Sequence, residues 1–218
     1  SASSPFWHGQ NTGLKSYRMS VFKALPRTGL PEAFSSWSEY RRHVDVLVEA
    51  GLIEDATKLW WDIRPSDRYP TLEMRSSDVC PSIEDGIAIA SIYMSLLAML
   101  YRHRMRTRRW RVYSRSLINE NIWRAQRYGA TGELIVFGQS RLGPFEELVE
   151  EIIDIVKNDA VERGCFAEVE HARTIVKRGT SAQRQLAIYH ESLEAGASEA
   201  EAGIAVVDFL IEETVAGL

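Results

Sequence analysis

Four charged side chains, spaced for two paired strands, are the first candidates for chemistry: Asp62, Arg64, Glu73 and Arg75. Side chains alternate between the two faces of a strand, so each pair of residues shares one face of its own strand. Pairing the strands brings two carboxylates and two guanidiniums onto one surface. A carboxylate supplies the hard oxygen that Mg²⁺ prefers, and an arginine fork binds phosphate or carboxylate through two hydrogen bonds. The alternative is a solvated strand face with cross-strand ion pairs.

A polar segment ahead of a short predicted helix is the second candidate. The stretch from Asn11 to Arg18 contains Thr12, Gly13 and Tyr17. Backbone N–H groups at such a helix start, together with the Arg18 guanidinium, suit an anion. The alternative is an ordinary surface loop.

A stripe on a later helix is the third candidate. Asn121, Arg124 and Tyr128 recur at helical spacing and lie on one face of a helix predicted from Ser116 to Tyr128. These side chains either face a ligand or bridge neighbouring elements, and the spacing leaves both interpretations open.

An arginine-rich run from Arg102 to Arg111, with Trp110 inside it, is the fourth candidate. Arginines interleaved with an aromatic residue are typical of a nucleic-acid surface. Cations also complement the C-terminal end of a helix and are usually solvated there. The whole chain carries a formal net charge of −4, which favours the helix-end interpretation and predicts no nucleic-acid partner.

Several common types of site are excluded by their missing motifs. The five histidines show neither HxH nor HExxH spacing, which argues against a metalloprotease-type site. The sequence has no GxSxG, GxxxxGK[ST] or GxGxxG motif. Any phosphate chemistry is therefore of neither P-loop nor Rossmann type.

The elements that must position these residues follow from periodicity and punctuation. Two alternating segments flank a Pro-rich turn and predict an antiparallel hairpin of strands 58–64 and 71–76. A short strand is predicted over 132–137. The predicted helices cover 17–25, 37–50, 82–106, 116–128, 144–164 and 165–178, with two more opening at Thr180 and Ser198.

Composition predicts an ordinary globular protein of the cytoplasm. The 218 residues are 45% hydrophobic and 26% charged, enough for one large domain or two small ones. Cys80 and Cys165 are far apart and fit a reducing compartment. The longest apolar stretch, 86–101, is shorter than the roughly 20 residues of a membrane span, so we expect a buried core helix and no membrane. A homo-oligomer is left open, because the sequence does not determine the oligomeric state.

The first residues resemble an interior loop. The chain starts at Ser1, and Phe6 and Trp7 stand where a terminus is usually polar and frayed. We expect that upstream sequence is absent.

Taken together, the motifs resemble the carboxylate–amine ligase family, in the type 2 branch of glutamate–cysteine ligases. The matching blocks stand in the family's order, cover most of residues 4–130, and continue more weakly through 179–184. They are Ser4-Pro5-Phe6-Trp7-x-Gly9, Thr12-Gly13-x-x-Ser16-Tyr17-Arg18, Leu25-Pro26-x-x-Gly29-Leu30-Pro31, Trp60-Trp61-Asp62-Ile63-Arg64-Pro65, Pro70-Thr71-Leu72-Glu73-Met74-Arg75 and Asn121-x-Trp123-Arg124-Ala125-x-Arg127-Tyr128-Gly129.

The resemblance implies a glutamine-synthetase-like α+β fold and amide ligation with ATP and Mg²⁺. In such a ligase ATP phosphorylates a carboxylate, here the γ-carboxyl of glutamate, and an amine, here that of cysteine, displaces phosphate. This is the chemistry of glutathione biosynthesis, with small-molecule substrates. The family's acidic, Glu-rich strands, which supply other metal ligands, are expected upstream of residue 4. Carried over by position, the resemblance makes Glu73 a metal ligand and gives roles at phosphate or substrate to Arg64, Arg75, Arg18, Tyr17, Thr12, Asn121 and Arg124.

The predicted organisation is a ligase portion over 1–140 and a helical subdomain over 141–218. The fold class is α+β, with a small antiparallel sheet that carries the site and a mainly helical C-terminal part. One alternative is a non-catalytic helical interaction module, centred on the well-capped residues 144–218. The other is nucleic-acid binding through Arg102–Arg111.

Overall fold

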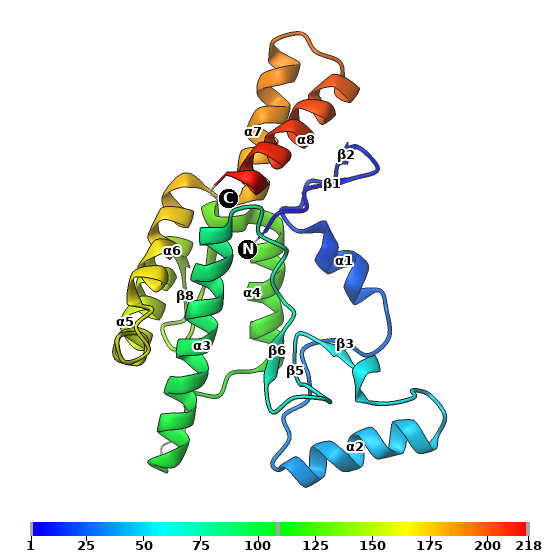
Figure 1. The fold of residues 1–218 in the computed structure, drawn as a ribbon, viewed down its shortest axis with the longest axis vertical. Helices are drawn as coiled ribbons and strands as arrows, with labels where there is room; N and C mark the ends of the chain where they lie inside the picture. The colour runs from blue at the N-terminus through cyan, green and yellow to red at the C-terminus, as the bar shows by residue number, and fades with distance from the viewer. Residues whose placement is uncertain (1, 108–109, 217–218) are drawn as a thin grey trace. The chain divides into compact units, whose positions relative to one another are not determined.

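A computed structural model of the chain describes residues 2–107 and 110–216 (Figure 1). The chain divides into two compact units. Unit 1 comprises Ser1–Tyr17 and Asp78–Leu218, and unit 2 comprises Arg18–Ser77. The predicted boundary between residues 140 and 141 falls in a hairpin of unit 1 and stays a prediction.

Unit 1 is mainly helical. Its elements are β1 (Phe6–Trp7), β2 (Gln10–Asn11), α3 (Ile83–Met105), α4 (Arg115–Tyr128), η2 (Gly129–Thr131), β7 (Glu133–Val136), β8 (Arg141–Pro144), α5 (Phe145–Glu162), α6 (Phe166–Arg178), α7 (Ser181–Glu194) and α8 (Glu199–Val215). Strands β1 and β2 pair antiparallel, as do β7 and β8.

Helices α3, α5 and α6 pack side by side around one apolar core (Figure 1). Val156 of α5 and Val169 of α6 are fully buried there, and Ile92 and Leu96 of α3 pack against them. Burying these side chains stabilises the helices far more than their intrinsic propensity does. The Ser82 hydroxyl accepts a hydrogen bond from the Asp85 N–H and caps α3 at its predicted start.

Helices α7 and α8 form a helical hairpin (Figure 1). Both begin with the predicted capping boxes, Thr180 with Gln183 and Ser198 with Glu201. Their shared core is centred on Tyr189, whose ring lies 5.0 Å from that of Phe6. The N-terminal segment is thereby anchored to the C-terminal hairpin.

Unit 2 is smaller. Its elements are α1 (Tyr17–Lys23, whose first residue is assigned to unit 1), β3 (Thr28–Gly29), α2 (Trp37–Glu49), η1 (Ala56–Lys58), β4 (Trp60–Trp61), β5 (Ile63–Pro65) and β6 (Leu72–Met74). Its core joins Tyr40 and Val44 of α2 to Leu59 and Trp61. The Ser36 hydroxyl caps α2, as predicted.

The predicted hairpin is confirmed, but its first strand is shorter than expected. Strand β5 pairs antiparallel with β6, with Arg64 opposite Glu73. Trp60 and Trp61 instead pair in parallel with β3. The backbone N–H of Asp62 donates to the Gly29 carbonyl, and the carbonyl of Asp62 accepts from the Arg75 N–H. The chain therefore changes its pairing partner at Asp62, from the β3 side to the β6 side.

The α+β class is confirmed, and the sheet of β5 and β6 is a small antiparallel sheet as predicted. Within the described residues the strands form four two-stranded sheets, and the sheet of β3 and β4 is parallel. Pro144, predicted at the first helical position, is the residue just before α5 and also ends β8.

Helix α3 has a long apolar middle between an acidic first turn and a basic last turn. By length and composition it is able to cross a membrane, and 28% of its most apolar window is buried. A core helix of a soluble protein passes the same test, and α3 does pack against α5 and α6. The predicted core helix is therefore present with part of its surface exposed, and the absence of a membrane partner stays a prediction.

Candidate functional site

Three of the predicted site residues form one ion-pair cluster in unit 2. The Nε atom of Arg64 donates to Oε2 of Glu73 at 2.9 Å, and Nη1 of Arg75 donates to the same oxygen at 3.1 Å. The hydrogen bond from Arg64, helped by that from Arg75, lowers the pKa of Glu73. Glu73 is therefore ionised at neutral pH. Because both arginines use Oε2, the Oε1 atom of this half-exposed side chain is left to face other groups.

Arg64 also holds the backbone of the preceding turn. Its Nη1 atom donates to the carbonyl oxygens of Thr57 at 2.7 Å and Leu59 at 2.6 Å, with a longer contact to Ala56. The side chain is buried. These contacts fix the position of the guanidinium that holds Glu73.

Arg18 lies beside the same cluster. Its Nη2 atom donates to the Arg75 carbonyl oxygen at 2.9 Å. The guanidinium carbons of Arg18 and Arg75 lie 5.0 and 6.0 Å from the centre of the Phe22 ring. Phe22 therefore holds two cations that would otherwise repel each other, and unit 2 brings Arg18, Arg64, Glu73 and Arg75 together as predicted.

Two buried polar atoms near this cluster lack hydrogen bonds. Neither Oδ2 of Asp62 nor Nε of Arg75 has a partner among the residues that the structure describes. Burial raises the pKa of Asp62, against the opposing charges of Lys23 and Arg18. Buried unpaired groups are costly and call for an explanation, such as a ligand. The donor at Arg75 fits a phosphate or carboxylate oxygen, and the acceptor at Asp62 fits a cation or a proton.

Thr12 and Tyr17 belong to unit 1, where the structure gives them local contacts. The Thr12 hydroxyl donates to the Pro5 carbonyl at 2.7 Å and accepts from the Leu14 N–H. The Tyr17 ring lies 5.3 Å from that of Trp7. Both residues shape the N-terminal loop, and their substrate roles stay predictions.

Asn121 and Arg124 join α4 to β7. The Asn121 side chain donates to the Ile135 carbonyl at 3.0 Å and accepts from the Ile135 N–H at 2.7 Å. Arg124 donates to the Glu133 carbonyl at 2.6 Å and lies against the Tyr128 ring. These contacts favour the bridging interpretation of the stripe, and substrate binding by either residue stays a prediction.

Arg102, the first arginine of the basic run, is used inside the fold. It binds Asp159 through two hydrogen bonds of 3.1 and 2.7 Å, and that carboxylate is buried. Arg111 contacts Glu151 and the Trp110 ring. Arg108 and Arg109 lie outside the described residues. The described contacts at Arg102 and Arg111 are to the protein's own carboxylates.

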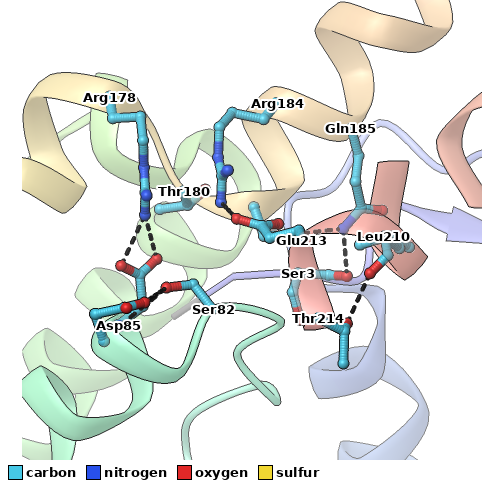
Figure 2. Close-up of polar contacts among 12 residues, drawn as sticks. Ser3, Ser82, Asp85, Arg178, Thr180, Arg184, Gln185, Leu210, Glu213 and Thr214 are labelled. Atoms are coloured by element: carbon cyan, nitrogen blue, oxygen red, sulfur yellow. Dashed lines mark hydrogen bonds and ion pairs between the residues drawn. The ribbon is translucent and has the colours of Figure 1, made fainter. Parts of the chain in front are cut away.

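The motif of residues 179–184 ties the ends of unit 1 together (Figure 2). Arg178, just before the motif, donates two hydrogen bonds to Asp85 at the start of α3. Arg184 forms an ion pair with Glu213 of α8, and Gln185 donates to the Ser3 carbonyl at 3.0 Å. The motif is thus a structural junction in this unit.

The carboxylates of the described residues fit a magnesium ion only in part. Within residues 2–107 and 110–216, no group of three or more His, Cys, Asp or Glu side chains is arranged to hold a metal. Mg²⁺ usually binds one or two protein carboxylates and completes its shell with phosphate oxygens and water. Glu73 fits that pattern as a single ligand through Oε1, whereas a closed protein cage for the ion does not exist in the described residues.

Sequence reasoning missed three contributors. Phe22 and Lys23 stand near the arginine cluster, and nothing in the local pattern distinguishes them from an ordinary helix end. Asp78 is a buried carboxylate that accepts hydrogen bonds from the Ser4 and Ser16 hydroxyls. Both serines stand in motif blocks, but no signal points to their partner.

Comparison with known proteins places the chain in a family. It matches glutamate-cysteine ligase family 2 over residues 1–203. A protein of Rhodospirillum rubrum, named "Putative glutamate--cysteine ligase 2", is 57% identical over 216 residues, which cover 99% of this chain and 56% of that protein. Proteins of the same name from Ruegeria pomeroyi and Chloroflexus aggregans are 50% and 43% identical to this chain over its whole length. The matched residues make up 56% and 54% of those two proteins. The chain therefore spans about half the length of the curated relatives it matches, and it belongs to glutamate-cysteine ligase family 2.

Proposed function

We propose that this chain carries part of the site of an ATP-dependent carboxylate–amine ligase, within a glutamine-synthetase-like catalytic fold. The proposed reaction activates a carboxylate, the γ-carboxyl of glutamate, as an acyl phosphate. An amine, that of cysteine, then displaces phosphate and forms the amide. The proposed setting is the cytoplasm, where the free thiols of Cys80 and Cys165 are expected to stay reduced.

One observation carries the proposal. Arg64 and Arg75 both bind Glu73 in unit 2, and Arg18 binds the backbone carbonyl of Arg75 beside them. The buried Nε atom of Arg75 has no partner there among the described residues. Two guanidiniums paired with one carboxylate, and the Arg18 guanidinium beside them, leave a surplus of positive charge. Fixed cations of this kind stabilise the charge that develops on a phosphoryl group during its transfer.

The residues have separable roles in this proposal. Arg64 holds Glu73 through Nε and is itself held by backbone carbonyls, so it positions the carboxylate. Arg75 offers its Nε atom, unpaired among the described residues, to a phosphate or carboxylate oxygen. A magnesium ion, when bound through Glu73, would neutralise charge on the nucleotide phosphates.

The alternative of a helical interaction module rests on a different observation. Helix α8 exposes an apolar stripe of Ile204, Val207, Ile211 and Val215, each more than half exposed. An exposed apolar stripe favours an interaction surface, and a homo-oligomer is one assembly it is compatible with. The arginine cluster in unit 2 is outside this stripe and supports the ligase function instead.

The test is Mg²⁺-dependent release of ADP from ATP, with glutamate and cysteine present. We expect release that needs both amino acids and falls at least about 100-fold in Arg75→Ala and in Glu73→Gln. Glu49→Gln, an exposed glutamate on α2, is the matched control and keeps the wild-type rate. ADP release that is equal in Arg75→Ala, Glu73→Gln and wild type would overturn the assignment of this cluster.

A further inference from the structure

Two cations that the ligase proposal does not use lie together in unit 1. Lys15 stands in the N-terminal loop, between the motif residues Gly13 and Ser16. Arg127 is itself a motif residue and lies in the last turn of α4. The backbone N–H of Lys15 donates to the Gln126 carbonyl at 2.7 Å, which fixes the loop against the helix end.

Two glycines allow this close approach. A Cβ atom on Gly13 would lie 3.0 Å from Nη1 of Arg127, so the guanidinium lies directly over the loop. A Cβ atom on Gly129 would lie 3.1 Å from Cγ of Lys15, so the lysine stem lies on that glycine. Both glycines have positive φ angles, of 74° and 64°, which disfavour other residues. The local backbone thus draws the two cationic side chains together.

The two positive charges have no carboxylate partner in the part of the chain that the structure describes. Neither Lys15 nor Arg127 forms an ion pair within residues 2–107 and 110–216. Asp78, the carboxylate bound to neighbouring Ser16, accepts hydrogen bonds from Ser16 and Ser4. Burial, and next the charge of Arg127, lower the pKa of Lys15. Two like charges held together in this way are stabilised by an anion placed between them.

We propose that Lys15 and Arg127 form an oxyanion site that binds a phosphate or carboxylate group. The site stands on this geometry alone, and only its use for a ligase substrate rests on the proposed function. Arg127 supplies a planar fork for two oxygens and Lys15 a point charge beside it. Arg127 is exposed and Lys15 is half-buried, so the pair is open to a ligand from solution.

The alternative is that Lys15 only complements the C-terminal end of α4. A cation near a helix C-terminus is favourable without any ligand. In that case the chain binds no anion at this position, and replacing Lys15 changes stability alone. The two interpretations therefore differ in a binding measurement that needs no turnover.

The experiment is calorimetric titration of the 218-residue chain with inorganic phosphate, ADP and glutamate, each in turn. Lys15→Met keeps the apolar stem on Gly129, and Arg127→Gln keeps polar contacts, so both variants are expected to fold. Lys177→Met and Arg104→Ala are matched controls on exposed helix ends. We expect at least one anion to bind, and both site variants to weaken it roughly 10-fold or more, while the controls bind as wild type.

A second readout follows the lysine itself. An amine-reactive acylating reagent, with the modified peptide quantified by mass spectrometry, measures the reactivity of Lys15. The bound anion should protect Lys15 and leave Lys177 unchanged. Binding of phosphate and ADP would identify the ligand as the phosphate end of a nucleotide. Binding of glutamate alone would identify it as a substrate carboxylate.

The proposal is overturned if none of the three anions binds, or if binding is unaffected by both variants. Its failure is distinguishable from that of the ligase proposal. Anion binding that is lost in Lys15→Met and kept in Arg75→Ala supports this site even when ADP release is absent. Loss of ADP release in Arg75→Ala with no anion binding at Lys15 supports the ligase proposal alone.

Discussion

The Nε atom of Arg64 donates a 2.9 Å hydrogen bond to Oε2 of Glu73, its direct cross-strand partner. The Nη1 atom of Arg64 donates to the backbone carbonyls of Thr57 and Leu59, in and just after η1. Arg64 is therefore both part of the fold of unit 2 and the residue that orients the candidate magnesium ligand. Its neighbour Arg75 has an unpaired Nε among the described residues and is the better candidate to touch substrate.

Replacing Arg64 with alanine should destabilise the chain by about 2–4 kcal/mol. The substitution leaves the carbonyl oxygens of Thr57 and Leu59 without their donor and takes one cation from Glu73. Urea denaturation measures the free energy of unfolding. Arg68→Ala, at an exposed turn position, is the control and should stay within about 0.5 kcal/mol of wild type. Equal stabilities of Arg64→Ala and Arg68→Ala would contradict the anchoring role.

The Glu73 ion pairs predict a loss of stability in acid. The folded-state pKa of Glu73 is lowered, first by the hydrogen bond from Arg64, below its unfolded value of about 4.3. The stabilisation is therefore fully present above the unfolded pKa and is lost as pH falls through the folded pKa. Unfolding free energies measured from pH 7 down to pH 3 should fall less steeply in Glu73→Gln than in wild type. Parallel curves would show that the ion pairs contribute nothing measurable.

Asp62 predicts the opposite dependence on pH. Burial raises the folded-state pKa of Asp62 above the unfolded value, because the ionised form is penalised. The contribution of Asp62 to stability therefore falls as pH rises from the unfolded pKa through the folded pKa. Asp62→Asn should therefore be more stable than wild type at pH 7 and lose this advantage in acid. The same variant should lose ligase activity if the unpaired Oδ2 serves the reaction. A destabilised Asp62→Asn at pH 7 would show that the ionised carboxylate is satisfied in solution.

Local signals predicted the helices well because their ends are chemically marked. Ser82, Thr180 and Ser198 act as caps at the predicted positions. Helix α6 ends directly before the expected Gly179, and α5 ends two residues before Gly164. The parallel pairing of Thr28–Gly29 with Trp60–Trp61 was missed. Two residues carry no periodicity, and the partner strand is distant in sequence, so only tertiary packing defines that sheet.

The candidate site was predictable only where a local pattern places its residues. Alternation along two adjacent strands brings Arg64 and Glu73 together, and a single turn sets that register. The approach of Arg127 to Gly13 depends on how α4 packs against the N-terminal loop, which no local pattern reports. Unpaired buried atoms, such as Oδ2 of Asp62, likewise become visible only once the neighbours are placed.

Arg102 should matter for stability and not for nucleic-acid binding. Its two hydrogen bonds join α3 to the buried Asp159 of α5. These hydrogen bonds are the largest cause of the lowered pKa of the Asp159 carboxyl. Arg102→Ala removes the ion-pair partner of a buried carboxylate and should lower the free energy of unfolding, measured by urea denaturation. Arg104→Ala, exposed on the same helix end, is the matched control with little change. Salt-sensitive retention of the chain on RNA, lost in Arg104→Ala, would instead revive the basic-run hypothesis.

Substitutions of Asn121 distinguish a bridging role of this side chain from a substrate-binding role. Its amide exchanges two hydrogen bonds with the backbone of Ile135, so Asn121→Ala should destabilise the chain by about 1–3 kcal/mol through the unpaired groups of β7. Asn121→Asp keeps the acceptor for the Ile135 N–H but loses the donor to its carbonyl, and it should fall between alanine and wild type. Denaturation curves give these differences, and the affinity for glutamate, measured by calorimetry on folded protein, gives the second readout. A bridging Asn121 changes stability and leaves affinity unchanged, because its whole amide is used at β7. Weaker glutamate binding in Asn121→Ala, at unchanged stability, would assign the side chain to the substrate.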